Sequence, residues 1–385
     1  MTFAVSFYAR KISRIPLDKT CSWHYWEFRT CRNHPSGEPQ TRKNDESYMI
    51  TIGSVPVETH IFLAPLSGCS DLAFRLIARE HGAKFCFFEM IDGHSLLGPH
   101  AKRVEILNTV AADRPIAAQL VGEKPELLRD AAQVLLEHTA VSFLDLNSAC
   151  PVKKVVKKGA GAGLLQNLPQ LYHILNLLAT TCAVPVTVKL RIGFQRVDLA
   201  WLRELAQGCQ DSGAAALFVH GRTREQGYSG DVNYEAIRVM KHAVTIPVIG
   251  SGNVFDPLSA QRMLTETDCD GVLVARGAFG NPWIFQQIEQ YLATGTLLPE
   301  ASRRAKKAAL IRHLAYLAEY KHNSVAGKIG IMRKVTLWYV KGFPNAAKIR
   351  GQMNTIGTYP ELLEFVDRHL TEEGEAPDSA AGINS

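Results

Sequence analysis

The 385-residue chain lacks the features of a membrane protein, a secreted disulfide framework or a structural zinc site. No apolar run approaches the roughly 18 residues that a membrane-spanning helix needs, and the N-terminus has no apolar core followed by a small-residue cleavage site. The eight cysteines contain no CxxC pair and no metal-ligand spacing, so we expect free thiols and no bound metal. We therefore predict a cytoplasmic protein that makes no membrane contact.

The chain also lacks an extreme charge and a dinucleotide-binding fingerprint. Its formal net charge of +6 permits an anionic partner without demanding one, and nothing points to an obligate protein partner. Gly159, Gly161 and Gly163 form a GxGxG run, but the sixth position is Leu164, and lysines rather than a strand precede the run. We expect these glycines to form the turn into the next helix.

Short apolar runs alternate with longer amphipathic stretches between residues 55 and 295. A doubly wound open sheet would give a similar alternation, but polar residues gather at the carboxyl ends of the runs, where barrel enzymes build their sites. The pattern therefore favours a (β/α)8 TIM barrel. Eight runs predict its strands: 60–65, 84–90, 115–121, 142–147, 184–191, 216–222, 246–252 and 271–277.

The flanks of this region differ from it. Residues 1–52 show no sustained period and predict a poorly ordered extension, and residues 371–385 predict a disordered tail. Residues 300–370 predict a smaller helical domain, with helices over 305–322, 330–342 and 360–370. This domain is basic, which suits either a polyanionic partner or a solvated face.

Glycine-rich turns follow the last two runs, in IGSGNV (249–254) and VARGAFG (274–280). A phosphate site after strands seven and eight recurs in TIM barrels, and the backbone N–H groups of these turns, with Arg276, are suited to hold one. The alternative is two tight turns that need glycine for their geometry.

Three further residues are candidates for chemistry. Lys189 shares one strand face with Thr187 and Arg191, and a lysine inside a barrel suggests an anionic ligand, a Schiff base or a structural ion pair. His220 ends the next run. Cys150 follows a strand end and precedes Pro151, which favours a functional thiol over a small buried hydrophobe.

These segments resemble the bacterial flavin-dependent tRNA-dihydrouridine synthases, most closely their B branch. The resemblance runs from about Ile61 to Phe285 and continues more weakly into the helical region. It rests on APLSGCSDLAFR (64–75), AAQLVG (117–122), DLNSACPVKKVVKKGAGAGLL (145–165), VPVTVKLRIGF (184–194), HGRTREQGYSG (220–230), IPVIGSGNV (246–254) and GVLVARGAFGNPWIF (271–285).

The resemblance implies an FMN-binding barrel, a helical tRNA-binding domain, and NADPH or NADH as the reductant. It implies flavin contacts for Pro65, Leu66, Ser67, Gln119, Lys189, His220, Ser251, Gly252, Asn253, Ala275 and Arg276. Asn147 would orient the uracil, and Cys150 would protonate C5 after hydride from the reduced flavin reaches C6. We expect the following basic residues to contact the tRNA: Lys153, Lys154, Lys157, Lys158, Arg222, Arg333 and Arg350.

Two departures from the family pattern and three rival functions stay open. The family commonly has Asn-Gly-Asp at Ser251-Gly252-Asn253, and Met-Gly at Ser148-Ala149. The rivals are a flavin barrel that reduces a free pyrimidine-like molecule, a non-catalytic RNA-binding protein, and a Schiff-base aldolase that uses Lys189.

Overall fold

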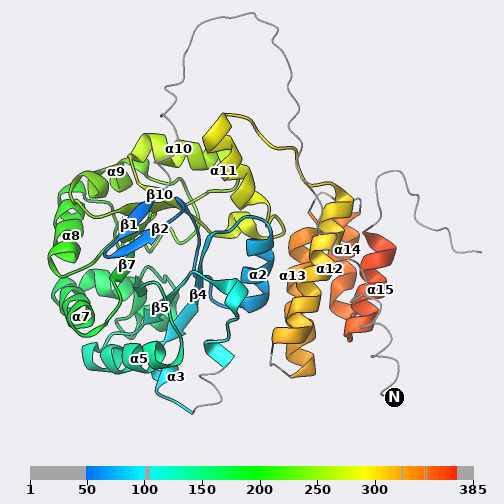
Figure 1. Cartoon of the computed structure of the whole chain (residues 1–385), viewed down its shortest axis with the longest axis horizontal. Coiled ribbons are helices and arrows are strands. Elements are labelled where there is room, and N and C mark those ends of the chain that lie inside the picture. Colours follow the sequence, from blue (N-terminus) through cyan, green and yellow to red (C-terminus); the bar gives the residue numbers. More distant parts are fainter. Residues whose placement is uncertain (1–48, 100–104, 322–323, 342, 344, 371–385) are drawn as a thin grey trace, which may run out of the picture. The chain divides into compact units, whose positions relative to one another are not determined.

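The computed structural model describes residues 49–99, 105–321, 324–341, 343 and 345–370, and these contain a closed barrel of eight parallel strands. The strands pair in the order β10-β3-β4-β5-β6-β7-β8-β9. Figure 1 shows the strands within a ring of helices. Each predicted run supplies one strand, so the TIM barrel is confirmed and the open sheet is excluded. The bounds are β3 (Ile61–Leu63), β4 (Phe85–Asp92), β5 (Ile116–Val121), β6 (Leu144–Ser148), β7 (Val186–Arg191), β8 (Leu217–His220), β9 (Val248–Ser251) and β10 (Gly271–Val274).

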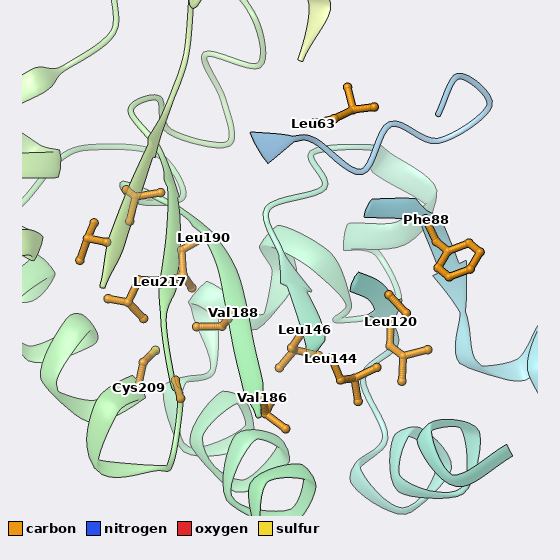
Figure 2. Packing of buried hydrophobic residues seen from close by; sticks show 14 of the residues in the cluster. Leu63, Phe88, Leu120, Leu144, Leu146, Val186, Val188, Leu190, Cys209 and Leu217 are labelled. Atoms are coloured by element: carbon orange, nitrogen blue, oxygen red, sulfur yellow. The ribbon is translucent and has the colours of Figure 1, made fainter. Parts of the chain in front are cut away.

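Helices cover the outside of the barrel, because every second strand side chain is apolar and points outward. Figure 2 shows this layer, in which Leu144, Leu146, Val186, Val188 and Leu190 take part in the packing of the strands against the helices. The helices are α2 (Leu72–Glu80), α3 (Gly93–Leu96), α5 (Pro125–His138), α6 (Lys153–Val156), α7 (Leu168–Thr181), α8 (Leu199–Asp211), α9 (Tyr234–His242), α10 (Pro257–Thr267) and α11 (Ile284–Thr294), with 3-10 turns at η1 (Ala111–Asp113), η2 (Gly161–Gln166) and η3 (Arg276–Ala278).

Aromatic side chains fill part of the barrel interior. Phe85 and Phe143 stack with ring centroids 5.0 Å apart, and Phe87 meets Phe218 edge-on at 5.2 Å. The same cluster includes Ile52 of a hairpin formed by β1 (Ile50–Ile52) and β2 (Val55–Val57). Large rings of this kind leave little room for a ligand within the cluster, so the space for one lies toward the carboxyl ends of the strands.

The β1–β2 hairpin lies at the end of the barrel opposite those carboxyl ends. Its turn residue Gly53 has φ +60°, and a Cβ there would come within 2.8 Å of Pro185, which directly precedes β7. Of the extension expected over residues 1–52, residues 1–48 lie outside the described part of the chain, and Ile50–Ile52 form β1.

The C-terminal helices have a core of their own, built from residues such as Leu314, Met332 and Leu362. The three predicted helices correspond to α12 (Arg303–Tyr320), α13 (Val325–Tyr339) and α15 (Tyr359–His369). The short α14 (Ala346–Gln352) and η4 (Met353–Thr355) were not predicted.

Helix α13 begins five residues earlier than predicted. The side chain of Ser324 caps its first turn by accepting a hydrogen bond from the N–H of Gly327 at 3.2 Å, so the helix tolerates two early glycines. The tail expected over 371–385 lies outside the described residues. Among the helices in the described ranges, none combines the length and the apolar character that crossing a membrane requires.

Candidate active site at the carboxyl end of the barrel

A chain of buried polar side chains joins β5, β6 and β7 inside the barrel. The side-chain amide of Asn147 donates to Gln119 Oε1 at 2.7 Å, and Gln119 Nε2 donates to Asp145 Oδ2 at 2.7 Å. Thr187 Oγ1 donates to Asp145 Oδ1, also at 2.7 Å. The predicted residues Gln119 and Asn147 are therefore directly joined.

Asp145 is a site residue that was not predicted. Its carboxylate is almost completely buried, and burial raises its pKa to about 6, against the opposing effect of hydrogen bonds from Thr187 and Gln119. The pattern LDLN over Leu144–Asn147 contained the signal, since alternation that sends both leucines outward sends Asp145 inward beside Asn147.

Lys189 lies inside the barrel, opposite Asn147 in the strand register. Burial, reinforced by the charge of Arg191, lowers its pKa to about 8, while the carboxylate of Asp145 acts in the opposite direction. The predicted assignment of the β7 side chains to two faces is confirmed. Val186, Val188 and Leu190 pack outward, and Thr187 forms its hydrogen bond inside the barrel. A cation that is easily neutralised thus faces the space above the aromatic cluster.

The loop that carries Cys150 is fixed from three sides. Asn147 Oδ1 accepts hydrogen bonds from the backbone N–H groups of Cys150 at 2.8 Å and Ala149 at 3.1 Å. Arg191 Nε donates to the carbonyl of Ala149 at 2.7 Å, and the N–H of Ala162 donates to the carbonyl of Cys150 at 3.0 Å. The thiol is partly exposed in a loop whose backbone is held in place.

The loop accepts Ser148 and Ala149 in place of the family's usual pair. Ala149 is not among the described non-glycine residues with positive φ, so its backbone does not need a glycine. The hydroxyl of Ser148 is buried and has no hydrogen-bond partner among the described residues. An unpaired buried hydroxyl costs free energy of folding, so we expect Ser148 to lower the stability of the folded chain.

Arg191 is a second residue that prediction did not place in the site. Its guanidinium is buried, and besides Ala149 it donates to the carbonyls of Thr223 at 2.8 Å and Gly227 at 2.9 Å. It therefore joins the Cys150 loop to the loop after β8. Its Cζ atom also lies 5.8 Å from the centroid of the exposed Tyr228 ring.

His220 ends β8 as predicted and is surrounded by positive charge. Burial, together with Lys189, Arg191, Arg222 and Arg276, holds its pKa well below the ordinary value, so the imidazole is neutral near pH 7. Arg222 Nη1 lies 3.5 Å from His220 Nε2. Because an arginine nitrogen only donates, a hydrogen bond between them requires Nε2 to accept and the ring proton to lie on Nδ1.

Arg222 occupies a different environment from the one expected for an RNA contact. Its side chain is buried, and it donates to the carbonyl of Gly230 at 2.6 Å and to Asn253 Oδ1 at 3.1 Å. The guanidinium thus fixes the loop after β8 and the turn after β9. This arginine serves the internal structure of the site.

The two predicted phosphate turns lie against each other. A Cβ on Gly277 would come within 2.2 Å of the carbonyl oxygen of Val254, and Gly252 has φ +132°. Asn253, with φ +52°, replaces the family's Asp and receives its hydrogen bond from Arg222. The close packing brings backbone from both turns together, so glycine is needed at these positions for the geometry of the turns.

Arg276 is exposed between two aromatic rings at this edge of the barrel. Its Cζ atom lies 4.8 Å from the Tyr228 ring centroid and 5.7 Å from that of Phe255. The adjoining Ala275 and buried Ser251 lie at the ends of neighbouring strands. Tyr228 is 59% exposed, so one face of this cluster is open to a ligand.

The loop after β3 contains Pro65, Leu66 and Ser67. It closes as a tight turn in which the N–H groups of Cys69 and Ser70 both donate to the carbonyl of Leu66 at 2.9 Å. Pro65 and Leu66 are partly buried, and Ser67 is exposed. The turn gives this loop a defined shape at the rim.

The predicted RNA-contacting residues other than Arg222 differ in how exposed their side chains are to solvent. Arg350 is exposed, whereas Arg333 is partly buried and donates to the carbonyl of Asn354 at 2.9 Å. Four lysines close to Cys150 are exposed on α6 and the turn that follows it: Lys153, Lys154, Lys157 and Lys158.

The residues present fit a planar anionic ring that carries a phosphate. Lys189 supplies a cation, Gln119 supplies amide groups, and His220 supplies a neutral imidazole on one side of the mouth. The paired glycine turns and Arg276 lie on the β9–β10 side, where a Cβ on Gly277 would have no room. Such a donor set is suited to a flavin mononucleotide.

Comparisons with known proteins show which family this chain resembles. A family model described as dihydrouridine synthase matches residues 62–375. The tRNA-dihydrouridine synthase B of Pseudomonas syringae pv. tomato is 36% identical over 332 residues, which cover 86% of this chain and 97% of that protein. A probable tRNA-dihydrouridine synthase of Rickettsia bellii is 33% identical over 332 residues, covering 84% of this chain and all of the relative.

Among solved structures, histamine dehydrogenase from Rhizobium sp. 4-9 superposes with a TM-score of 0.51 at 12% sequence identity. The match covers 70% of this chain and 50% of that one. At this identity the likeness shows the barrel fold alone.

Proposed function

This chain belongs to the dihydrouridine synthase family, and we infer that it reduces the C5=C6 bond of uridines in tRNA, with Cys150 as the proton donor to C5. The chain is therefore an oxidoreductase that acts on tRNA. One observation carries the assignment of Cys150: its backbone is fixed by Asn147, a member of the buried polar chain beside Lys189.

A thiol suits the protonation step because hydride addition at C6 leaves an enolate whose C5 needs a proton. The partly exposed thiol of Cys150 is open to a base that enters from solvent. The base must first leave its stack in the tRNA, as enzymes that act on single bases require. In the proposal, the second amide hydrogen of Asn147 is available to the uracil, since its first bonds Gln119.

We propose FMN as the cofactor, held by Lys189, Gln119 and His220 at the ring and by the two glycine turns at the phosphate. A reduced flavin would supply the hydride for C6. The charge of Lys189 would stabilise negative charge that develops near the ring. Such an electrostatic interaction is strong in a site shielded from water. Neutral His220 can donate through Nδ1 without adding a further charge.

The exposed lysines are proposed to bind RNA phosphates. Lys153, Lys154, Lys157 and Lys158 are exposed on α6 and the turn after it, a few residues beyond Cys150, and exposed Arg350 lies on the helical region. Phosphate contacts fix register and orientation without reading sequence, so these residues would dock the tRNA. NADPH or NADH is the proposed electron source, and a tRNA substrate suits a cytoplasmic location.

The test compares Cys150→Ala with Cys182→Ala, a partly buried cysteine directly after α7. We expect Cys150→Ala to keep its flavin spectrum and lose at least about 100-fold in single-turnover dihydrouridine formation, a loss typical of a removed acid. Cys182→Ala should match wild type. Equal rates in all three proteins would reject Cys150 as the donor.

Two further outcomes address the rival functions. A colourless protein that binds tRNA but forms no dihydrouridine would indicate a non-catalytic RNA-binding protein. Reduction of free uracil but not of tRNA would indicate a small-molecule enzyme. Mapping dihydrouridine in tRNA from cells that lack the protein identifies the positions it modifies.

A further inference from the structure

Helix α13 of the C-terminal region makes direct contact with the loop after β3. Lys334 Nζ donates a hydrogen bond to the carbonyl of Gly68 and lies 3.8 Å from Cys69 Sγ. The two partners are 266 residues apart in sequence. Gly68 directly follows Pro65-Leu66-Ser67, the segment proposed to line the flavin.

The carbonyl of Gly68 bonds Lys334 of α13. Gly68 has φ +68° and its own Cβ position is open, so side-chain packing of this residue does not fix the turn. The contact with Lys334 therefore holds the outer edge of the turn.

The same helix also meets the turn after β10. The Trp338 ring stacks on Phe279 with centroids 4.3 Å apart and an interplanar angle of 3°. A Cβ on Gly280 would lie 2.0 Å from the carbonyl oxygen of Trp338, so these backbones are in close contact. Lys334 Nζ lies 5.4 Å from the Trp338 ring centroid, which links the two contacts within α13.

Helix α13 thus touches both loops that are proposed to hold the flavin, one near the ring and one near the phosphate. We propose that Lys334 is a positioning residue for the reaction, which holds the loop after β3 in its flavin-binding shape from the helical region. The inference rests on the proposed function. It separates Lys334, whose Nζ donates to a carbonyl within the protein, from exposed basic residues of this region such as Arg350.

In this proposal, tRNA binding and flavin binding are coupled through α13. Any movement of α13 when tRNA docks changes the hydrogen bond between Lys334 and Gly68, so tRNA and flavin should affect each other's affinity. Such coupling is reciprocal: the factor by which tRNA changes FMN affinity equals the factor by which FMN changes tRNA affinity.

The experiment uses the full-length protein with Lys334→Met, Lys334→Arg and Lys328→Met. Lys328 is the matched control, because it lies on the same helix and donates to Ala318, within the helical region. FMN dissociation constants are measured by flavin fluorescence, with and without tRNA. Circular dichroism confirms that each variant folds.

We expect Lys334→Met to weaken FMN binding about tenfold, since a charge-assisted hydrogen bond is lost. Lys334→Arg should restore most of the affinity because it keeps a charged donor, and Lys328→Met should bind FMN as wild type does. The change in FMN affinity on adding tRNA should shrink in Lys334→Met alone.

Equal FMN affinity in wild type and Lys334→Met overturns the inference and leaves the proposed function intact. An equal loss in Lys334→Met and Lys328→Met also overturns it, because the cause would then be helix charge in general. A wild-type protein that binds no FMN rejects the proposed function itself.

Discussion

The side-chain oxygen of Asn147 accepts a hydrogen bond from the backbone N–H of Cys150 at 2.8 Å. The bond joins the end of β6 to the loop that carries the thiol. The same amide donates to Gln119, which bonds the carboxylate of Asp145. The position of Cys150 is thereby fixed by the interior of the barrel and not by the loop alone.

We expect Asn147→Ala to lower the single-turnover rate of dihydrouridine formation about 10- to 100-fold, because a small displacement of a reacting group has effects of this size. Flavin content should change little, since Lys189 and the glycine turns remain. Rapid-quench measurements of dihydrouridine in tRNA check the rate. A rate within twofold of wild type would show that the loop holds Cys150 without Asn147.

Gly161 lies against Cys150. It has φ +57°, and a Cβ would come within 2.9 Å of Cys150 Cβ and 3.0 Å of the Cys150 carbonyl oxygen. Gly161→Ala should therefore displace the thiol and reduce the rate at least about tenfold, in addition to about 1–2 kcal/mol of backbone strain.

The control for that variant is Gly295→Ala after α11, where φ is +70° and no atom lies within 4 Å of the added Cβ. It carries similar backbone strain without the collision. Thermal unfolding should show destabilisation of both variants, larger in Gly161→Ala because of the collision, whereas only Gly161→Ala should lose activity. Parallel losses of activity would attribute the effect to stability.

The sequence predicted the parts of the molecule that follow from periodicity. All eight strands were located, because buried parallel strands are short apolar runs, and the inward face of β7 followed from alternation at Thr187 and Lys189. Arg222 was expected to contact RNA, yet it is buried. Its partners, Gly230 and Asn253, reach it only after the loops have folded, and local spacing contains no information about such contacts.

The same limit explains the roles of Arg191 and Lys334. Arg191 bonds loops after two different strands, and Lys334 reaches a carbonyl 266 residues away. Composition described Lys334 only as one of many basic residues in a helical region. Tertiary structure decides which of these cations face solvent.

Lys189 gives the reaction a pH dependence that can be measured. Its pKa is lowered to about 8, so the protonated fraction falls as pH rises through 8. If its charge stabilises the reacting flavin, the single-turnover rate should decline above pH 8. Lys189→Met should be slow at every pH, and a decline above pH 8 that persists in this variant belongs to another group. A wild-type rate that stays constant from pH 7 to 9.5 would contradict this role.

His313 makes the helical region sensitive to acid. It is fully buried against Phe74, Trp338 and Tyr339, and burial lowers its pKa from 6.5 to about 4, with Asp71 weakly opposing. Between these two pKa values the unfolded chain binds a proton that the folded chain does not. The free energy of unfolding therefore falls by up to about 3 kcal/mol as the pH drops from 6.5 to 4. Above pH 6.5 this loss is absent. Urea unfolding of wild type and His313→Leu, followed by circular dichroism at pH 4.5 to 7.5, measures this. The variant should lose less stability on acidification, and identical pH slopes would assign the acid sensitivity to other groups.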